Sequence, residues 1–269
     1  MMAIAVTSGK GGVGKTVLAA NLGIALSLKG QRVVLFDADL GLANLDIILG
    51  IKAEFTLEHV LDHVKDLSEV MVEGPGGTRV VAGGSGIGKL LRMSRKRFHE
   101  FLLQMSQLDS STDFLIFDTG AGAEAKVITV LRYADEVVLV ATPDPASIMD
   151  AYATAKVLFR HKPDAFIWVV VNFVTDAAQA EKVFLLLQSS TRRFLGKGLH
   201  YCGAVRQDAQ VAHWVRQRRP FLEADPKLPA SRDVMALADR LIARPSHQSL
   251  QGVVERVRSA FDSGDHKSA

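Results

Sequence analysis

Short apolar runs alternate along the chain with longer stretches in which apolar residues recur at helical spacing. Three runs, Phe114–Phe117, Val137–Val140 and Trp168–Val171, are continuously apolar, as expected for strands covered on both faces. The pattern predicts strands at Ala3–Thr7, Arg32–Asp37, Arg79–Ala82, Asp113–Asp118, Glu136–Ala141, Ala165–Asn172 and Tyr201–Val205. It predicts helices at Thr16–Leu28, Leu57–Val64, Ser94–Gln107, Ala123–Arg132, Pro145–Arg160, Asp176–Phe194, Asp208–Gln217, Ser231–Ile242 and Gln248–Phe261.

Strands that alternate with helices predict an α/β fold with a doubly wound, mostly parallel sheet of about seven to eight strands and helices on both faces. Ligands of such sheets bind at the carboxyl ends of the strands, so the residues that follow each strand are the first candidates for a site. The glycine-rich loop Gly83–Gly88 lacks a GK[ST] ending, and we predict that it is a turn.

Composition narrows the class of protein. The chain has 269 residues and is 48% hydrophobic, enough for one sizeable core. Its single cysteine, Cys202, excludes a disulfide framework and a CxxC metal site within the chain. The net charge of +3 permits contact with anionic surfaces without requiring it. With neither a secretory signal nor a run of about 20 apolar residues, we expect a cytoplasmic protein.

The segment GKGGVGKT, Gly9 to Thr16, carries the clearest chemistry. It fits the Walker A pattern, and it follows a predicted strand and opens a predicted helix. In such a loop the backbone N–H groups surround phosphate oxygens, the lysine before the Ser/Thr meets the β- and γ-phosphates, and the hydroxyl binds Mg²⁺. These roles fall on Lys15 and Thr16, with the loop supplied by Gly9, Lys10, Gly11, Gly12, Val13 and Gly14. The alternative is an ordinary glycine turn.

A phosphate loop needs only one lysine, and this one has a second, Lys10. GKGGVGKT resembles the deviant Walker A motif of the MinD/ParA class of P-loop ATPases, a SIMIBI-class fold. The resemblance implies that ATP and Mg²⁺ are bound between two subunits and that Lys10 reaches the nucleotide of the partner subunit, in the manner of an arginine finger. The alternative for Lys10 is a solvated loop charge.

Carboxylates follow two of the predicted strands. Asp37 and Asp39 lie in FDADLGLANLD, and Asp118 follows the apolar run FLIF in the Walker B arrangement. The resemblance implies that Asp39 orients the attacking water, that Asp37 serves the Mg²⁺ shell and that Asp118 binds Mg²⁺ directly or through water. A helix N-cap or a solvated strand end is the alternative for Asp37 and Asp39.

A second set of candidate residues would lie near the base and the α-phosphate of the nucleotide. Asn172 ends a predicted strand, and in the family an asparagine here contacts adenine, although a turn-forming residue is the alternative. Arg206 stands where the family usually has a proline in a loop that contacts the base. Val17 replaces a threonine that many relatives place near the α-phosphate.

The resemblance covers about residues 2–245. The segments DADLGLANLD, GGSGI, DTGAG and TPDPASIMDAYATAK are most similar to the flagellar-number branch of MinD-like ATPases. That branch implies a slow ATP hydrolase that dimerises with ATP and controls the placement or number of flagella. Its expected partners are a signal-recognition-type flagellar GTPase, a flagellar transcription regulator or switch-complex proteins. The extension that activates the GTPase in many members does not precede the first strand here, so we do not expect that activity.

We divide the chain into an ATPase domain, residues 1–245, and a C-terminal amphipathic helix with a polar tail, residues 246–269. Apolar residues from Leu250 to Phe261 share one helical face, which would bind the inner face of the cell membrane or pack on the core.

The runner-up function is a ParA-type partition ATPase that binds nonspecific DNA. Basic clusters at 92–97 and 216–219 would serve it, but a solvated surface is the preferred interpretation. An iron–sulfur relative is excluded because it needs paired cysteines.

Overall fold

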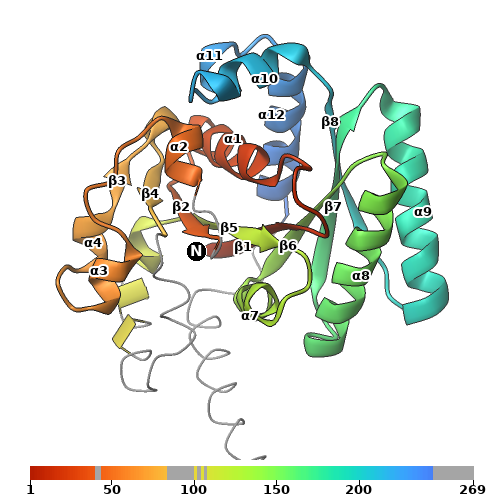
Figure 1. Ribbon diagram of the computed structural model, residues 1–269, viewed down its shortest axis with the longest axis horizontal. Coiled ribbons are helices and arrows are strands. Elements are labelled where there is room, and N and C mark those ends of the chain that lie inside the picture. The colour runs from red at the N-terminus through yellow and green to blue at the C-terminus, as the bar shows by residue number, and fades with distance from the viewer. Residues whose placement is uncertain (40–43, 84–99, 102–103, 106–107, 245–269) are drawn as a thin grey trace, which may run out of the picture.

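The computed structural model describes residues 1–39, 44–83, 100–101, 104–105 and 108–244. Within these residues one sheet of eight strands has the order β3-β4-β2-β5-β1-β6-β7-β8 (Figure 1), and only the β3–β4 pairing is antiparallel. The strands are β1 Met2–Ser8, β2 Val33–Ala38, β3 Val72–Glu73, β4 Arg79–Val81, β5 Phe114–Ala121, β6 Glu136–Ala141, β7 Phe166–Val174 and β8 His200–Arg206. The predicted fold class is therefore confirmed.

Helices cover both faces of the sheet, as Figure 1 shows. On one face pack α1 Lys15–Leu28, α2 Leu45–Leu49, α11 Phe221–Ala224 and α12 Pro229–Ile242. On the other pack α3 Leu57–Leu61, α4 Leu67–Val70, α7 Ala125–Tyr133, α8 Pro145–His161 and α9 Ala177–Leu195. The remaining elements are α10 Ala209–Arg216 and two 3-10 turns, η1 Pro75–Gly77 and η2 Asp109–Ser111.

The continuous apolar runs separate into two cores because successive strand residues face opposite sides. In β6, Val138 and Val140 join the core under α1 and α12, whereas Val137 and Leu139 join the core under α7, α8 and α9. Burial on both faces is what gives such a strand its unbroken apolar sequence.

All seven predicted strands are present, within a few residues of the expected ends. The eighth, β3, was missed because it is two residues long and pairs only at the edge of the sheet. The helix predicted at Leu57–Val64 ends early, at Leu61, and the chain turns at His63, whose φ is 58°. The predicted helices Ser94–Gln107 and Gln248–Phe261, and the loop Gly83–Gly88, lie largely or wholly outside the described residues.

Among the helices of the described ranges, none is long and apolar enough to cross a membrane.

Helix α12 is attached to the sheet by arginine contacts along its length. Arg206 at the end of β8 pairs with Asp233, with Nη2 and Oδ1 2.7 Å apart. Arg240 donates to the carbonyl of Cys202 at 2.8 Å, and close by a Cβ on Gly203 would lie 2.6 Å from Leu237. The helix is therefore fitted to β8 both by charge and by shape.

The final contact of this helix region is the most buried. Arg244 pairs with Glu136 across 2.5 Å and lies over the ring of Phe166. Glu136 is 5% exposed, and its other oxygen accepts a hydrogen bond from the Trp168 indole at 2.5 Å. This arrangement compensates the desolvation of the carboxylate at the amino end of β6.

We expect Arg244→Ala to lower the free energy of unfolding by about 2–4 kcal/mol, because it leaves the Glu136 carboxylate buried without its cation. Urea denaturation measures the change. Arg232→Ala, which removes an exposed arginine of the same helix region, is the matched control. Equal stability of the two variants would contradict this role of Arg244.

Candidate active site: a phosphate loop beside buried carboxylates

The phosphate loop joins β1 to α1 at the centre of the sheet, where β1 lies between β5 and β6. Gly14 is the N-cap of α1 with φ 83°, and Gly12 has φ 80°, so both positions require glycine. A Cβ on Gly9 would lie 2.1 Å from the carbonyl carbon of Asp150 in α8. A Cβ on Gly11 or Gly12 would meet nothing within 4 Å. The loop is thus packed at its ends and open at its middle, as a phosphate cradle must be.

Lys15 is the first residue of α1, and its side chain points into the protein. Its Nζ lies 2.7 Å from Asp118 Oδ1, and the two side chains are 8% and 1% exposed. Nζ also lies 3.4 Å from the Thr16 hydroxyl, which itself interacts with Asp118. Burial raises the pKa of Asp118, and the Lys15 ammonium opposes that shift. The structure therefore brings three predicted site residues, Lys15, Thr16 and Asp118, into one cluster.

Asp37 lies beside Asp118 in the register of β2 and β5. It is 1% exposed, and its oxygens accept backbone hydrogen bonds from Asp39 at 3.1 Å and from Leu45 at 3.2 Å. Burial, and then the charge of Asp118, raise the pKa of Asp37 to about 7. This carboxyl group therefore joins the end of β2 to the start of α2, and its burial beside Asp118 opposes its ionisation.

Asp39 faces the segment that ends β5. A Cβ on Gly120 would lie 3.5 Å from Asp39 Oδ1, and the N–H of Gly122 donates to the carbonyl of Ser8 at 2.7 Å. The glycines of DTGAG thus lie between Asp39 and the start of the phosphate loop. Gly120 belongs to β5, which continues to Ala121 with an irregular register opposite Ser8.

Lys10 extends from the other side of the loop. Its Nζ lies 2.9 Å from Asp144 Oδ2, and both side chains are 46% exposed. The hydrogen bond to Asp144 raises the pKa of Lys10, and the same bond lowers the pKa of Asp144. Asp144 is also the N-cap of α8 and accepts from the N–H of Ala146 at 3.1 Å. Because this pair is open to water, Lys10 is held in place only weakly.

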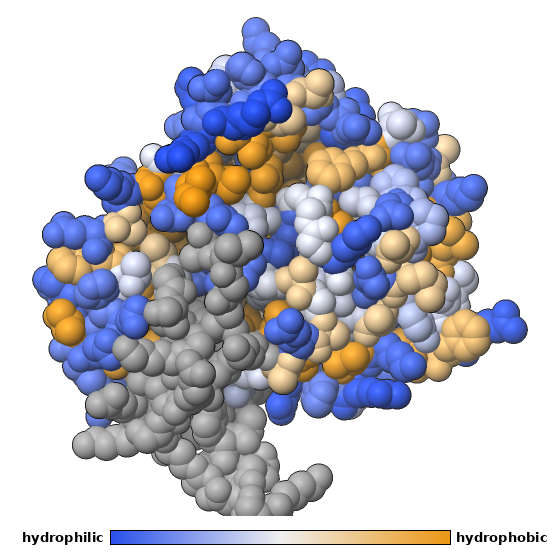
Figure 2. All heavy atoms as spheres, viewed as in Figure 1, coloured by the Kyte–Doolittle hydropathy of each residue, from blue (hydrophilic) through white to orange (hydrophobic). Residues whose placement is uncertain are grey.

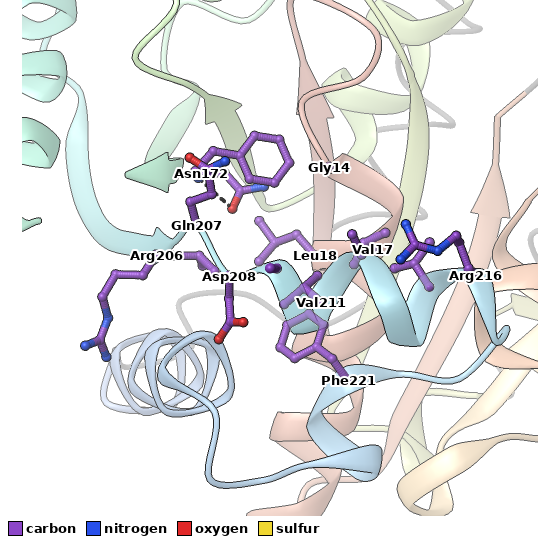
Figure 3. Close-up of a pocket in the computed structure, with 15 residues that line it drawn as sticks. Gly14, Val17, Leu18, Asn172, Arg206, Gln207, Asp208, Val211, Arg216 and Phe221 are labelled. Carbon is purple, nitrogen blue, oxygen red and sulfur yellow. Dashed lines mark hydrogen bonds between the residues drawn. The ribbon is translucent and has the colours of Figure 1, made fainter. Parts of the chain in front are cut away.

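A cavity of about 590 Å³ opens beside Gly14, a size common for small-molecule sites. Figure 2 shows apolar side chains gathered below the hydrophilic cap formed by α10 and α11. In the close-up of Figure 3, Leu18 of α1 lies opposite Val211 of α10 and above Phe221. An apolar cavity next to a phosphate cradle is suited to the base of a nucleotide.

Asn172 and Arg206, the two candidates for contact with the base, differ in where their side chains point. Asn172 lines the cavity, and its Nδ2 donates to the carbonyl of Val13 at 2.8 Å while Oδ1 accepts from the N–H of Phe173 at 3.0 Å. Arg206 contributes to the lining, but its guanidinium points away toward α12 (Figure 3), where it pairs with Asp233. Val17 packs against the core and also lines the cavity.

Sequence reasoning missed two residues of this region. Asp144 precedes Pro145 at the start of α8, a known N-cap signal, so its position at a helix end could have been found. Phe173 lines the cavity and is 39% exposed with φ 59°. Nothing in the apolar run around Phe173 predicts a left-handed backbone.

The oxygen atoms gathered at the phosphate loop fit Mg²⁺ and a nucleoside triphosphate. Thr16, Asp37 and Asp118 carry the oxygen atoms that Mg²⁺ prefers and would hold it directly or through water. Among the described residues, no group of three His, Cys, Asp or Glu is arranged to hold a metal by itself. The geometry defines a P-loop nucleotide-binding protein.

The comparison with protein families agrees with this class. The ParA family model, described as NUBPL iron-transfer P-loop NTPase, matches residues 1–242. The chain therefore belongs to the ParA/MinD family of P-loop NTPases.

Among curated proteins, the chain is 37% identical to the antiactivator FleN of Pseudomonas aeruginosa over 94% of this chain and 90% of that protein. It is 34% identical to the flagellum site-determining protein YlxH of Helicobacter pylori over 96% of this chain and 87% of that protein. The resemblance inferred from the sequence motifs, including its flagellar branch, is thereby confirmed.

Solved structures support the fold. MinD in the MinC:MinD cell division complex of Aquifex aeolicus superposes with a TM-score of 0.74 at 25% identity, covering 93% of this chain and 100% of that chain. MinD of Pyrococcus horikoshii, complexed with Mg-ADP, has a TM-score of 0.74 at 21% identity, covering 90% of this chain and 96% of that chain. The second likeness shows the fold alone.

We expect Lys15→Ala to weaken ATP binding by about 100-fold or more, because it removes the charge-assisted hydrogen bonds to the phosphates. Isothermal titration calorimetry measures the affinity, and thermal denaturation checks that the fold survives the loss of the ion pair with Asp118. Lys29→Ala, which breaks the surface pair with Asp239, is the control. ATP affinity equal to that of the wild type would refute the role of Lys15.

Proposed function

We propose that this chain is a MinD-like regulatory ATPase that binds Mg-ATP, dimerises and hydrolyses ATP slowly to control the placement or number of flagella. One observation supports the proposed dimer. The phosphate loop has two lysines: Lys15 is buried within its own site, and Lys10 is half-exposed at the surface, where it can reach a partner subunit. The names of the similar proteins, an antiactivator and a flagellum site-determining protein, support the flagellar role.

In this proposal the residues of the loop divide the work. The backbone of Gly9–Thr16 surrounds the phosphates, and Lys15 leaves Asp118 for the β- and γ-oxygens. Thr16, Asp37 and Asp118 hold Mg²⁺, which neutralises charge on the phosphates when it is bound. Asp39 orients water in line with the terminal phosphate. Asn172 and the backbone near Arg206 enclose the base.

Dimerisation makes the proposed switch. Lys10 exchanges its weak contact with Asp144 for the phosphates of the partner subunit's nucleotide, where it stabilises negative charge during hydrolysis. The triphosphate then holds the two subunits together, and hydrolysis weakens that hold. The dimer presents surfaces to a flagellar transcription regulator, a signal-recognition-type flagellar GTPase or switch-complex proteins.

The proposed location is cytoplasmic, with peripheral attachment to the membrane through residues 246–269. Two such segments on one dimer would bind anionic lipid by avidity where a single segment is too weak. The competing ParA-type function would use the exposed arginines Arg216, Arg218 and Arg219 to bind duplex DNA.

We expect Asp39→Ala to slow ATP hydrolysis by about 100-fold or more and so to accumulate an ATP-bound dimer. Gel filtration with Mg-ATP, Mg-ADP and no nucleotide measures the state of the chain. The ATP sample is expected to elute as a dimer and the other two as monomers.

Lys10→Ala is the matched variant, because it leaves the buried half of the site unchanged. It should bind ATP as a monomer with affinity near that of the wild type and lose turnover. A monomeric Asp39→Ala protein under saturating ATP, or normal turnover by Lys10→Ala, would contradict the shared site.

We expect deletion of residues 246–269 to abolish ATP-dependent sedimentation with anionic liposomes while the thermal transition of the remaining chain is retained. In this proposal the segment contacts lipid and takes no part in the dimer. The same deletion should therefore leave the ATP-dependent elution in gel filtration unchanged. ATP-dependent binding of the full chain to plain duplex DNA, with no binding to liposomes, would favour the partition function instead.

A further inference from the structure

Phe173 has an unusual backbone for an aromatic residue. Its φ of 59° lies in the left-handed region, and the pairing of β7 with β8 is irregular between Asn172 and Val174. Bulky side chains rarely adopt this conformation, and where it occurs it tends to be held by its surroundings at a functional site. The side chain is 39% exposed, whereas Asn172 and Val174 on either side are buried.

The surroundings that hold this conformation come from the phosphate loop. The amide of Asn172 accepts the N–H of Phe173 through Oδ1 and donates to the carbonyl of Val13 through Nδ2. The same amide therefore fixes the direction of Phe173 and the position of the loop. With one hydrogen bond at each end of this amide already made within the chain, less of its capacity remains to read the edge of a base.

The ring of Phe173 lies next to the start of α1. A Cβ on Gly14 would be 3.1 Å from Cζ of this ring, so the ring reaches the point where the phosphate loop becomes a helix. The ring lines the same cavity as Val17 and Leu18, with Val211 and Val215 of α10 among its other walls. The cavity therefore begins at the phosphate cradle and has an exposed aromatic ring at that end.

We propose that Phe173 is the residue on which the base of the bound nucleotide stacks, and that Asn172 positions it. This inference rests on the proposed nucleotide-binding function and adds the source of base affinity. An aromatic face attracts the π-face of a base by dispersion and desolvation, and it needs no hydrogen-bonding groups on the base. A base stacked here keeps its phosphates at the α1 N-terminus, because the Phe173 ring lies so near Gly14 that a Cβ there would be 3.1 Å from it.

The test separates the base from the phosphates. Calorimetry measures the affinity of the 269-residue chain for Mg-ADP and for inorganic tripolyphosphate, which carries phosphates without a base. Phe173→Asn removes the ring with a residue that tolerates the left-handed backbone, and Phe173→Tyr keeps an aromatic ring. Phe173→Gly, which removes the ring and the backbone strain together, is the second ring-less variant.

We expect Phe173→Asn and Phe173→Gly to weaken Mg-ADP binding by about 10-fold and to leave tripolyphosphate binding within about 2-fold of the wild type. Phe173→Tyr should bind both as the wild type does. The thermal transition of the Asn and Gly variants should be equal to or higher than that of the wild type, since strain is relieved.

Two results would overturn the inference. Unchanged ADP affinity in the ring-less variants would show that the base does not use the ring. An equal loss of ADP and tripolyphosphate affinity would show that Phe173 only shapes the phosphate loop. Failure of the proposed function is distinguishable from both, because then the wild-type protein itself would not bind Mg-ADP.

Discussion

The buried contact between Lys15 and Asp118 unites the parts of this molecule that matter for its chemistry. It joins the first helix to the fifth strand, more than 100 residues further along the chain. A parallel sheet makes the contact possible, because β1, β2 and β5 all end at the same edge. An ammonium and two carboxylates buried together are costly to arrange for stability alone, and they form the set of groups that a Mg-nucleotide would rearrange.

The two sides of the phosphate loop differ in polarity. On the side of β2 and β5 the groups are charged and buried, and their positions are fixed by backbone hydrogen bonds to Asp37. On the side of β7 and β8 the walls are mostly apolar, and α10 contributes much of the surface although none of its residues is fully buried. Phosphates and a base need these two environments, and the loop lies between them.

The sequence alone predicted seven of the eight described strands, the phosphate loop and the carboxylates that follow the strands, because each depends on local pattern. Continuous apolar runs indicate strands that are buried on both faces. The motif GKGGVGKT indicates the backbone conformation of a phosphate-binding loop. The remaining features depend on contacts between distant segments. The pairing of Arg206 with Asp233 and the left-handed backbone of Phe173 are set by α12 and by the phosphate loop. The edge strand β3 and the short helices α2, α4 and α11 carry too few residues for periodicity to detect.

The close fit between Gly203 and Leu237 has a consequence for how related sequences vary. A Cβ at position 203 would lie 2.6 Å from Leu237, and the φ of 144° at this position strains any residue other than glycine. A smaller residue in α12 would relieve the contact but not the backbone strain. Homologues that dock their last helix on β8 in the same way are therefore expected to retain glycine here whatever stands opposite it.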